Sequence, residues 1–384
     1  MNPIYLDNAA TTQIRDEVIS KMSEVLKSNY GNASSTHAFG RSSKSIIESC
    51  RKRIAAHINA LPSEIIFTSG GTEADNLALR SSVKDLKVTH IITSKIEHHA
   101  VLYTVEQLVL DFGIDVSYVD ILEDGCIDYT HLEFLLKSTK KTLVSLMHIN
   151  NEIGTILDIQ KVANLCQANN TLFHSDTVQS IGHYTIDVQQ TPVDFLVASA
   201  HKFHGPKGVG FAFIRKNSGL KSLIIGGTQE RGIRAGTESI HDIVGLDEAL
   251  SISYEFLEHE NNFVKELKSY FISELNTHVP GVKFNGSCSD SENSTYTLVN
   301  VCLPVSATNA PMFLFQLDLK GIACSKGSAC QSGSGKGSHV LSQILQKDDM
   351  EKPSIRFSFS IYNTKQELDT VVGILKELVN ETNS

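Results

Sequence analysis

The sequence predicts an α/β protein with a mostly parallel central sheet, helices on both faces of that sheet, and a smaller α+β lobe. Two features of its 384 residues lead to this prediction. Apolar runs of strand length alternate with amphipathic helical patterns, which is typical of parallel sheets. A long helical pattern over 241–277 then contains no proline and suits a connector between two domains.

The expected elements follow one another in chain order. After an extended N-terminal stretch and a Gly/Asn/Ser-rich loop at 30–40, we expect strands at 65–68, 90–93, 116–119, 142–147, 171–174, 195–198 and 209–214. Helices are expected between them at 73–82, 100–112, 129–137 and 159–168. The smaller lobe has strands at 282–284, 296–302 and 355–359 and helices near 310–319 and 365–379. The expected large domain spans 15–255, and the small domain combines 1–14 with 256–384.

Composition excludes several classes of protein. The chain is 41% hydrophobic and 20% charged with a net charge of −9, which describes an ordinary globular protein and argues against a dedicated nucleic-acid binder. It has neither a basic segment followed by an apolar stretch at its start nor an apolar run of ~18 residues, so we expect a cytoplasmic protein without a membrane segment. The seven cysteines include no C-x-x-C pair, so a disulfide framework and the commonest zinc sites are not expected.

The richest polar cluster surrounds Lys202. An apolar strand ends at Ser199, and Lys202 follows it in a turn closed by Gly205 and Pro206. Open α/β sheets bind their ligands at the carboxyl ends of such strands. An isolated lysine is more often a surface residue, but Ser199, His201 and His204 bring further polar groups into the same turn.

Two other segments complete a pattern. A second apolar strand ends near Asp176. A Gly-rich turn at 69–71 precedes a helix whose free N–H groups suit an anion, although an ordinary capped helix start is an equally good interpretation. A phosphate cradle, a buried carboxylate and a nucleophilic lysine are the parts that a pyridoxal phosphate enzyme needs. The nearby histidines lack an HExxH helix or cysteine partners, so a metal site is only a minor alternative and none is assigned.

At this point the chain resembles the cysteine desulfurases of the NifS/IscS type, in the class V aminotransferase group of fold-type I pyridoxal phosphate enzymes. The resemblance rests on motifs that run nearly end to end: YLDNAATT (5–12), YGNASSTHAFGR (30–41), FTSGGTEADNLAL (67–79), IEHHAVL (96–102), MHINNEIGT (147–155), HSDTVQSIG (174–182), SAHKFHGPKGVG (199–210), RGIRAGTES (231–239), GSAC (327–330) and IRFSFS (355–360). It implies the fold-type I architecture.

The resemblance also implies roles for individual residues in binding the cofactor. Lys202 would bind pyridoxal 5'-phosphate covalently, Asp176 would face its pyridine nitrogen, and His98 would stack on the ring and assist proton transfer. Hydrogen bonds to the phenolic oxygen side would come from Gln179 and Asn150. The phosphate would be held by Gly71, Thr72, Ser199 and His201, together with Thr237 of a second subunit. A homodimer with shared sites is therefore implied.

The substrate and the sulfur are assigned in the same way. Arg356 would bind the α-carboxylate of L-cysteine, with Asn32 and Asn150 as further contacts near the substrate. Cys330 lies in a Gly- and Ser-rich loop at about 321–338, where a thiol is accessible and can travel. Its thiolate would attack the substrate sulfur, giving L-alanine and a persulfide. Cys324 at the start of this loop is expected to be mainly structural, with a redox role as the minor alternative.

The expected function is therefore cysteine desulfurization. The sulfur would pass to an acceptor, such as an iron–sulfur scaffold protein, with tRNA thiolation as a further use and a transient cluster contact at Cys330 through the scaffold. Direct nucleic-acid or membrane binding is not expected. Ala33 stands where the family's loop motif has proline, and Gln331 follows the cysteine where Thr or Ala is more common, which leaves the acceptor open. A selenocysteine lyase and a catalytically silent scaffold remain as alternatives.

Overall fold

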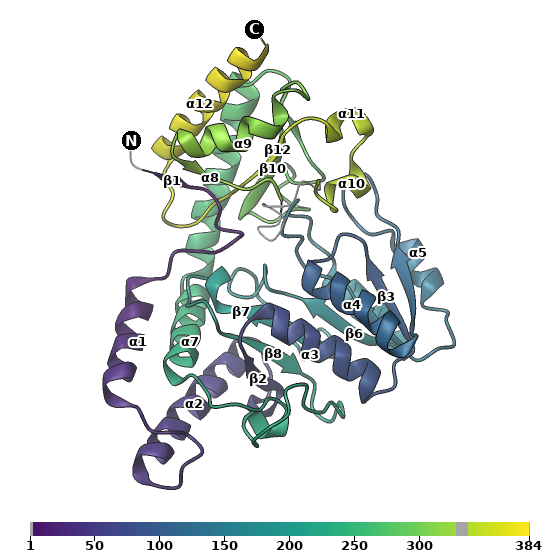
Figure 1. The fold of residues 1–384 in the computed structure, drawn as a ribbon, viewed down its shortest axis with the longest axis vertical. Helices are drawn as coiled ribbons and strands as arrows, with labels where there is room; N and C mark the ends of the chain where they lie inside the picture. The colour runs from purple at the N-terminus through teal and green to yellow at the C-terminus, as the bar shows by residue number, and fades with distance from the viewer. Residues whose placement is uncertain (1–2, 328–336, 384) are drawn as a thin grey trace.

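The computed structural model describes residues 3–327 and 337–383 and has two parts joined by a long helical connector (Figure 1). The larger part contains a seven-stranded sheet in the order β2-β8-β7-β6-β5-β3-β4. Only β8 runs antiparallel to the other six strands of this sheet. The strands are β2 (Ile65–Thr68), β3 (His90–Ser94), β4 (Asp115–Val119), β5 (Thr142–Ser145), β6 (Leu172–Asp176), β7 (Phe195–Ser199) and β8 (Gly210–Ile214). The predicted fold class is confirmed.

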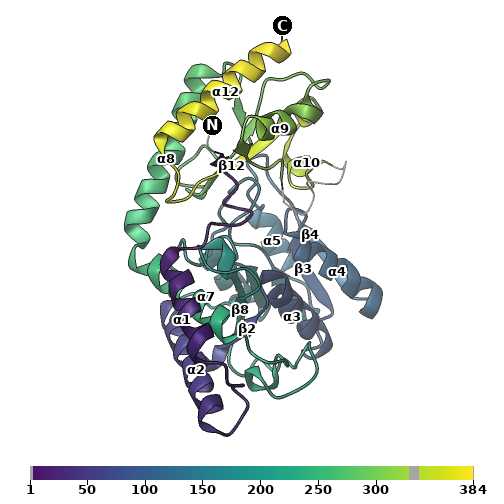
Figure 2. The ribbon, with the colours of Figure 1, turned by 60° about the vertical axis from the view of Figure 1, so that its left-hand side comes forward.

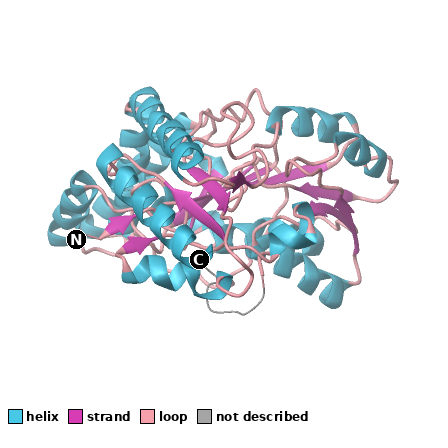
Figure 3. Ribbon diagram, turned by 90° about the horizontal axis from the view of Figure 1, so that it is seen from above, coloured by secondary structure: helices cyan, strands magenta, loops and turns pink. Residues whose placement is uncertain are grey.

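Helices cover both faces of this sheet (Figure 3). They are α1 (Asp16–Ser28), α2 (Ala38–His57), α3 (Gly71–Lys84), α4 (His99–Phe112), α5 (Tyr129–Leu135), α6 (Ile159–Ala168) and α7 (Ile240–Glu255). Strand β7 shows why both faces are apolar. Leu196 and Ala198 point into the core shared with α2, α6 and α7, whereas Phe195 and Val197 point into the core shared with α3 and α4. Side chains alternate between faces along a strand, so a strand that packs against an apolar core on both faces is apolar at successive positions.

The smaller part has its own core and a three-stranded antiparallel sheet. Strand β10 (Leu298–Cys302) lies between β12 (Ser354–Ser358) and β9 (Lys283–Phe284). The helices are α8 (Leu257–His278), α9 (Ala310–Leu319), α10 (Leu341–Ile344), α11 (Lys347–Met350) and α12 (Lys365–Asn383). At the N-terminus, β1 (Ile4–Tyr5) pairs in parallel with β11 (Ile322–Ala323), so Ile4 and Leu6 belong to this second core. The expected domain boundaries remain a prediction, because the cores show what packs together and not what folds alone.

The connector differs from its sequence pattern. We expected one helix over 241–277, but the structure has α7 and α8 with a break at Phe256, where the backbone leaves the helical region (φ −103°, ψ 13°). Neither glycine nor proline marks the break, so the sequence carried no signal for it. Figure 2 shows α7 and α8 running along one side of the molecule from the larger to the smaller part. Over the described residues, no helix combines the length and the apolar character needed to cross a membrane.

Candidate active site

A cavity of about 220 Å³ lies at the carboxyl ends of β6 and β7. Asp176 is the last residue of β6, Ser199 is the last residue of β7, and Lys202 ends the short 3-10 turn that follows. Parallel strands bring their carboxyl ends to one edge of the sheet, which is why residues far apart in sequence meet here. The predicted site residues that line this cavity are Gly71, Thr72, His98, Asp176, Gln179, Ser199, His201, Lys202 and Arg356.

The amine of Lys202 faces the N-terminal segment. Its Nζ donates hydrogen bonds to the carbonyl oxygens of Ala9 (2.6 Å) and Ala10 (2.9 Å). The turn after Lys202 is tight, because a Cβ on Gly205 would lie 2.8 Å from the Ala200 side chain. Gln179 Nε2 also donates to the Ala9 oxygen at 2.9 Å. Residues 9 and 10 therefore form one wall of the cavity.

Asp176 is a buried carboxylate that lines the same cavity. Its Oδ1 accepts a hydrogen bond from the Val178 N–H at 2.9 Å. Burial raises the pKa of Asp176, while this hydrogen bond and the charge of Lys202 act in the opposite direction. A cationic group placed against Asp176 would favour its ionised form. The site therefore suits a ligand with a protonated ring nitrogen.

A second buried acid, Asp75, lines the same cavity. Asp75 Oδ1 is 3.3 Å from His174 Nε2, and neither atom makes a hydrogen bond of good geometry within the described residues. Burial raises the pKa of Asp75 well above its usual value, and the charges of Asp176 and Glu97 add to this effect. Burial lowers the pKa of His174 to about 3, so its ring is neutral. The sequence pattern did not single out Asp75 as a cavity residue.

The turn between β2 and α3 forms an anion cradle. Helix α3 begins at Gly71, and a Cβ at that position would lie 2.6 Å from Val178 Cγ2, so the backbone approaches too closely for a side chain. The first residues of the helix, Gly71 and Thr72, line the cavity together with Ser199 and His201. The same four residues line an adjoining cavity of about 390 Å³. Free N–H groups and the positive helix end suit a phosphate dianion.

His98 is the N-cap of α4 and its ring lines the cavity. Its Nδ1 accepts a hydrogen bond from the Ala100 N–H at 3.1 Å, so the neutral ring carries its proton on Nε2. Burial, with the nearby charges of Lys202 and His339, lowers the pKa of His98 to about 4. The ring is therefore neutral at pH 7, with Nε2–H as its donor.

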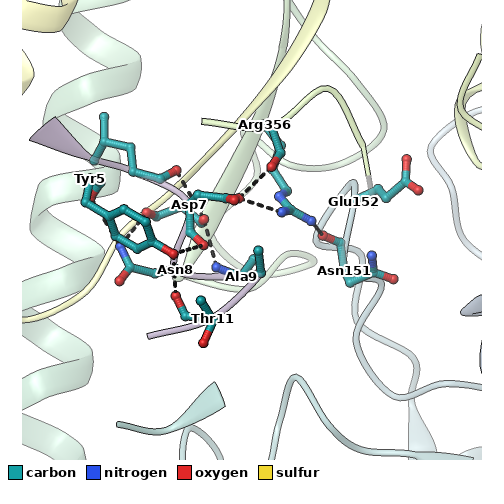
Figure 4. A network of polar contacts seen from close by, with 12 residues as sticks. Tyr5, Asp7, Asn8, Ala9, Thr11, Asn151, Glu152 and Arg356 are labelled. Atoms are coloured by element: carbon teal, nitrogen blue, oxygen red, sulfur yellow. Dashed lines mark hydrogen bonds and ion pairs between the residues drawn. The ribbon is translucent and has the colours of Figure 1, made fainter. Parts of the chain in front are cut away.

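Arg356 lies in β12, in the smaller part of the molecule, and lines the cavity. Figure 4 shows its contacts with Asp7 and Asn151. Its Nη1 donates to the Asn151 carbonyl oxygen at 2.7 Å, and its Nη2 donates to Asp7 Oδ1 at 2.8 Å. The side chain is 1% exposed. A buried guanidinium and an amine that line the same cavity can hold a small molecule that carries a carboxylate.

Asn150 does not line this cavity, so the structure does not bring it together with the other predicted residues, and its assignment to cofactor and substrate stays a prediction. Its Nδ2 donates to the Ile96 oxygen at 2.9 Å, and its Oδ1 accepts from the N–H groups of Glu152 and Ile153. Its side chain lines a separate small pocket, whereas the neighbouring Asn151 lines the cavity. Two adjacent asparagines have the same chemistry, so the sequence alone could not choose between them.

Two further expected residues lie together elsewhere. Asn32 and Thr237 line a cavity of about 280 Å³ at the end of α1, and neither lines the cavity of Lys202. Cys330 lies outside the described residues. Cys324 is described, and burial raises the pKa of its thiol to about 12, which makes it a poor nucleophile near neutral pH. In the described parts of the chain, no set of three or more His, Cys, Asp or Glu side chains is arranged to hold a metal ion.

Some cavity residues were missed by the sequence reasoning. They are Ala9, Ala10, Asp75, Met147, Asn151 and Val178. All of them fall inside the quoted motifs, but alanine, methionine and valine carry no chemistry that would mark them. Their part in the cavity follows from backbone carbonyls and close packing, which a residue type does not reveal.

Comparison with known proteins gives a consistent result. The family model described as aminotransferase class-V matches residues 4–371. The chain is 40% identical to the cysteine desulfurase IscS of Dictyoglomus turgidum, covering 98% of this chain and 95% of that protein. It is 40% identical to the putative cysteine desulfurase IscS 1 of Bacillus subtilis, covering 99% of each.

Solved structures agree with these relatives. A structure described as a NifS-like protein superposes with a TM-score of 0.89 at 33% identity and covers 98% of this chain and 99% of its own. A structure of SspA in complex with cysteine superposes with a TM-score of 0.81 at 32% identity and covers 94% of this chain and 100% of its own.

Proposed function

The chain belongs to the class-V aminotransferase family, and from that membership we propose that it is a pyridoxal-phosphate-dependent cysteine desulfurase. The proposed reaction converts L-cysteine to L-alanine and leaves the sulfur as a persulfide on Cys330. One observation carries the proposal: an amine, a buried carboxylate, an anion cradle and a buried guanidinium line a single cavity. Each of these groups matches one part of the cofactor or the substrate.

The residues of the cavity fit pyridoxal phosphate. Asp176 would face the pyridine nitrogen, and the start of α3 with Thr72, Ser199 and His201 would hold the phosphate. The close approach of Gly71 to Val178 supports this fit, since Gly71, Thr72 and Val178 all line the cavity and a side chain at position 71 would crowd it. When bound at Lys202, the cofactor supplies an electron sink for the amino acid substrate.

The chain's own groups would perform the remaining steps. Arg356 would hold the α-carboxylate, and His98 would stack on the ring and use Nε2 as a proton donor. The Cys330 thiolate would attack the sulfur of L-cysteine, so that an S–S bond forms while the C–S bond breaks. The electron pair of the broken bond returns to the substrate carbon, and protonation of that carbon gives L-alanine.

We further propose a homodimer. Tyr30 and Phe39 stack with ring centroids 5.3 Å apart and are largely exposed, beside the cavity that contains Asn32 and Thr237. A second subunit covering this face would bury the two rings and bring Thr237 toward the partner's phosphate. We propose that the enzyme works in the cytoplasm and passes sulfur to an iron–sulfur scaffold protein or a tRNA-thiolation protein.

Two other functions predict different products. A selenocysteine lyase would release alanine from selenocysteine and little from cysteine, and a silent scaffold would release none from either. The test is to measure alanine, sulfide and selenide from the purified holoenzyme with each amino acid in parallel, in the presence of a thiol reductant that releases the persulfide sulfur as sulfide. Alanine and sulfide from cysteine at equal rates support the proposal; alanine from selenocysteine alone, or from neither substrate, rejects it.

A further inference from the structure

We propose that Asp7 is a positioning residue that aligns the Arg356 guanidinium for the α-carboxylate of the substrate. The inference rests on the proposed function, in which Arg356 binds that carboxylate. It adds a residue of the N-terminal segment, and it makes this segment part of substrate recognition as well as a wall of the cavity.

The guanidinium is held from two sides (Figure 4). Nη2 donates to Asp7 Oδ1 at 2.8 Å, and Nη1 donates to the Asn151 carbonyl oxygen at 2.7 Å. Asp7 follows β1, whereas Asn151 belongs to the larger part of the molecule. Because a guanidinium is planar and its donors form a fixed fork, two bonds on different sides set the orientation of the whole group.

These two bonds leave donors for a ligand. A guanidinium has five N–H groups, and Nε of Arg356 is buried without a hydrogen-bond partner among the described residues. Arg356 also lines the cavity that contains Lys202. A substrate carboxylate can therefore bind the remaining donors while Asp7 stays in place.

Asp7 is itself held in position. Its Oδ1 also accepts a hydrogen bond from Ser325 Oγ at 2.8 Å. Ser325 exchanges two backbone hydrogen bonds with Arg356, and Asp7 forms a β-bridge with Ser358. The three segments thus lie side by side as short pieces of sheet, which is the rigid support that a binding group needs.

Asp7 is also negative and would repel a bound carboxylate, so the two effects must be weighed. The Asp7 side chain is 19% exposed and the Arg356 side chain is 1% exposed. Water next to Asp7 screens its repulsion of the ligand. The alignment acts through direct hydrogen bonds and is not screened in this way. Loss of the Asp7 charge should therefore weaken the binding of a carboxylate.

The test compares two amines that differ only in the carboxylate. L-alanine and ethylamine are titrated into holoenzyme, and their dissociation constants are read from the visible absorbance of the bound cofactor. The variants are Asp7→Asn, Ser325→Ala and Arg356→Lys. The matched control is Tyr5→Phe, because Tyr5 Oη bonds the backbone oxygens of Asp7 and Thr11 and leaves the Asp7 carboxylate alone. Cofactor affinity is measured for each variant.

Asp7→Asn should raise the dissociation constant of L-alanine about tenfold and change that of ethylamine by less than about twofold. A misaligned guanidinium affects only a ligand whose carboxylate it contacts. Ser325→Ala should raise the dissociation constant of L-alanine about threefold, because it removes one hydrogen bond that orients Asp7. Tyr5→Phe should change the dissociation constant of neither amine, and the affinity for the cofactor should be the same in all variants. If Asp7→Asn does not fold, Ser325→Ala carries the same test.

The outcomes separate this inference from the proposed function. Suppose that Arg356→Lys weakens the binding of L-alanine more than that of ethylamine. If Asp7→Asn then weakens the binding of both amines equally, leaves both dissociation constants unchanged or tightens the binding of L-alanine, the inference about Asp7 is wrong and the carboxylate site stands. If Arg356→Lys itself does not discriminate, the carboxylate site of the proposed function is wrong, and the role of Asp7 falls with it.

Discussion

The contact between Gly71 and Val178 makes a quantitative prediction about cofactor binding. In Gly71→Ala the new Cβ would lie 2.6 Å from Val178 Cγ2, whereas ordinary contacts begin near 3.4 Å. Val178 lines the cavity and must move by roughly 0.8 Å, and overpacking of this kind costs about 1–3 kcal/mol. Without cofactor the valine can relax into the cavity. With cofactor bound it cannot, so the cost falls on binding.

The expected result is a cofactor dissociation constant raised about 5- to 150-fold, since each 1.4 kcal/mol is a factor of ten. The assay titrates pyridoxal phosphate into apoenzyme and follows the visible absorbance of the bound form. Gly71→Ala/Val178→Ala is the matched variant, because removal of Cγ2 restores the space and should recover most of the affinity. Wild-type affinity in Gly71→Ala, or no recovery in the double variant, would refute this account of the cradle.

Three other predictions concern the two covalent residues and one buried lysine. Cys330→Ser should bind cofactor and cysteine but release no sulfur by the persulfide route, because a hydroxyl is a much poorer nucleophile than a thiolate. Cys324→Ser should keep most of the activity. If a sulfide assay shows an active Cys330→Ser and an inactive Cys324→Ser, the persulfide forms on Cys324. Lys202→Ala should lose the visible absorbance of the bound cofactor together with turnover, and an unchanged spectrum would contradict its role. Burial lowers the pKa of Lys268 to about 8, and its Nζ donates to Ser294 Oγ and to the Thr295 oxygen. The pKa of Lys268 in the folded state lies below its unfolded value near 10.4, so the unfolded chain binds more protons between these two values. The free energy of unfolding should therefore rise between about pH 8 and 10.4, by at most about 3 kcal/mol. Lys268→Met should flatten this rise in urea denaturation at several pH values, and an equally steep rise in the variant would show that other groups cause it.

Much of the fold could be predicted because its signal is local. The central strands of the large sheet are buried and largely apolar, as residues 195–198 of β7 illustrate, and the predicted strand ranges fall within a few residues of the observed ones. Burial on both faces imposes that composition directly. The break at Phe256 could not be predicted, since no glycine or proline produces it.

Some residues of the candidate site could be predicted from the sequence and others could not. Lys202, Asp176 and the turn at Gly71 could be located because each lies at or just after the carboxyl end of a strand, and the geometry of the sheet brings such positions together. The choice between Asn150 and Asn151 could not be made, because it depends on which amide the backbone of the following turn engages. Asp7 was inside a quoted motif, but its contact with Arg356 joins residues 349 positions apart and has no local pattern.

Transfer of one sulfur atom to Cys330 tests the central claim most directly. The holoenzyme is mixed with one equivalent of L-cysteine in the absence of reductant, and the alanine and the mass of each cysteine-containing peptide are measured. The account predicts one alanine for each sulfur gained, with that sulfur on the peptide containing Cys330. Absence of alanine, or a sulfur found on Cys324 instead, would contradict it.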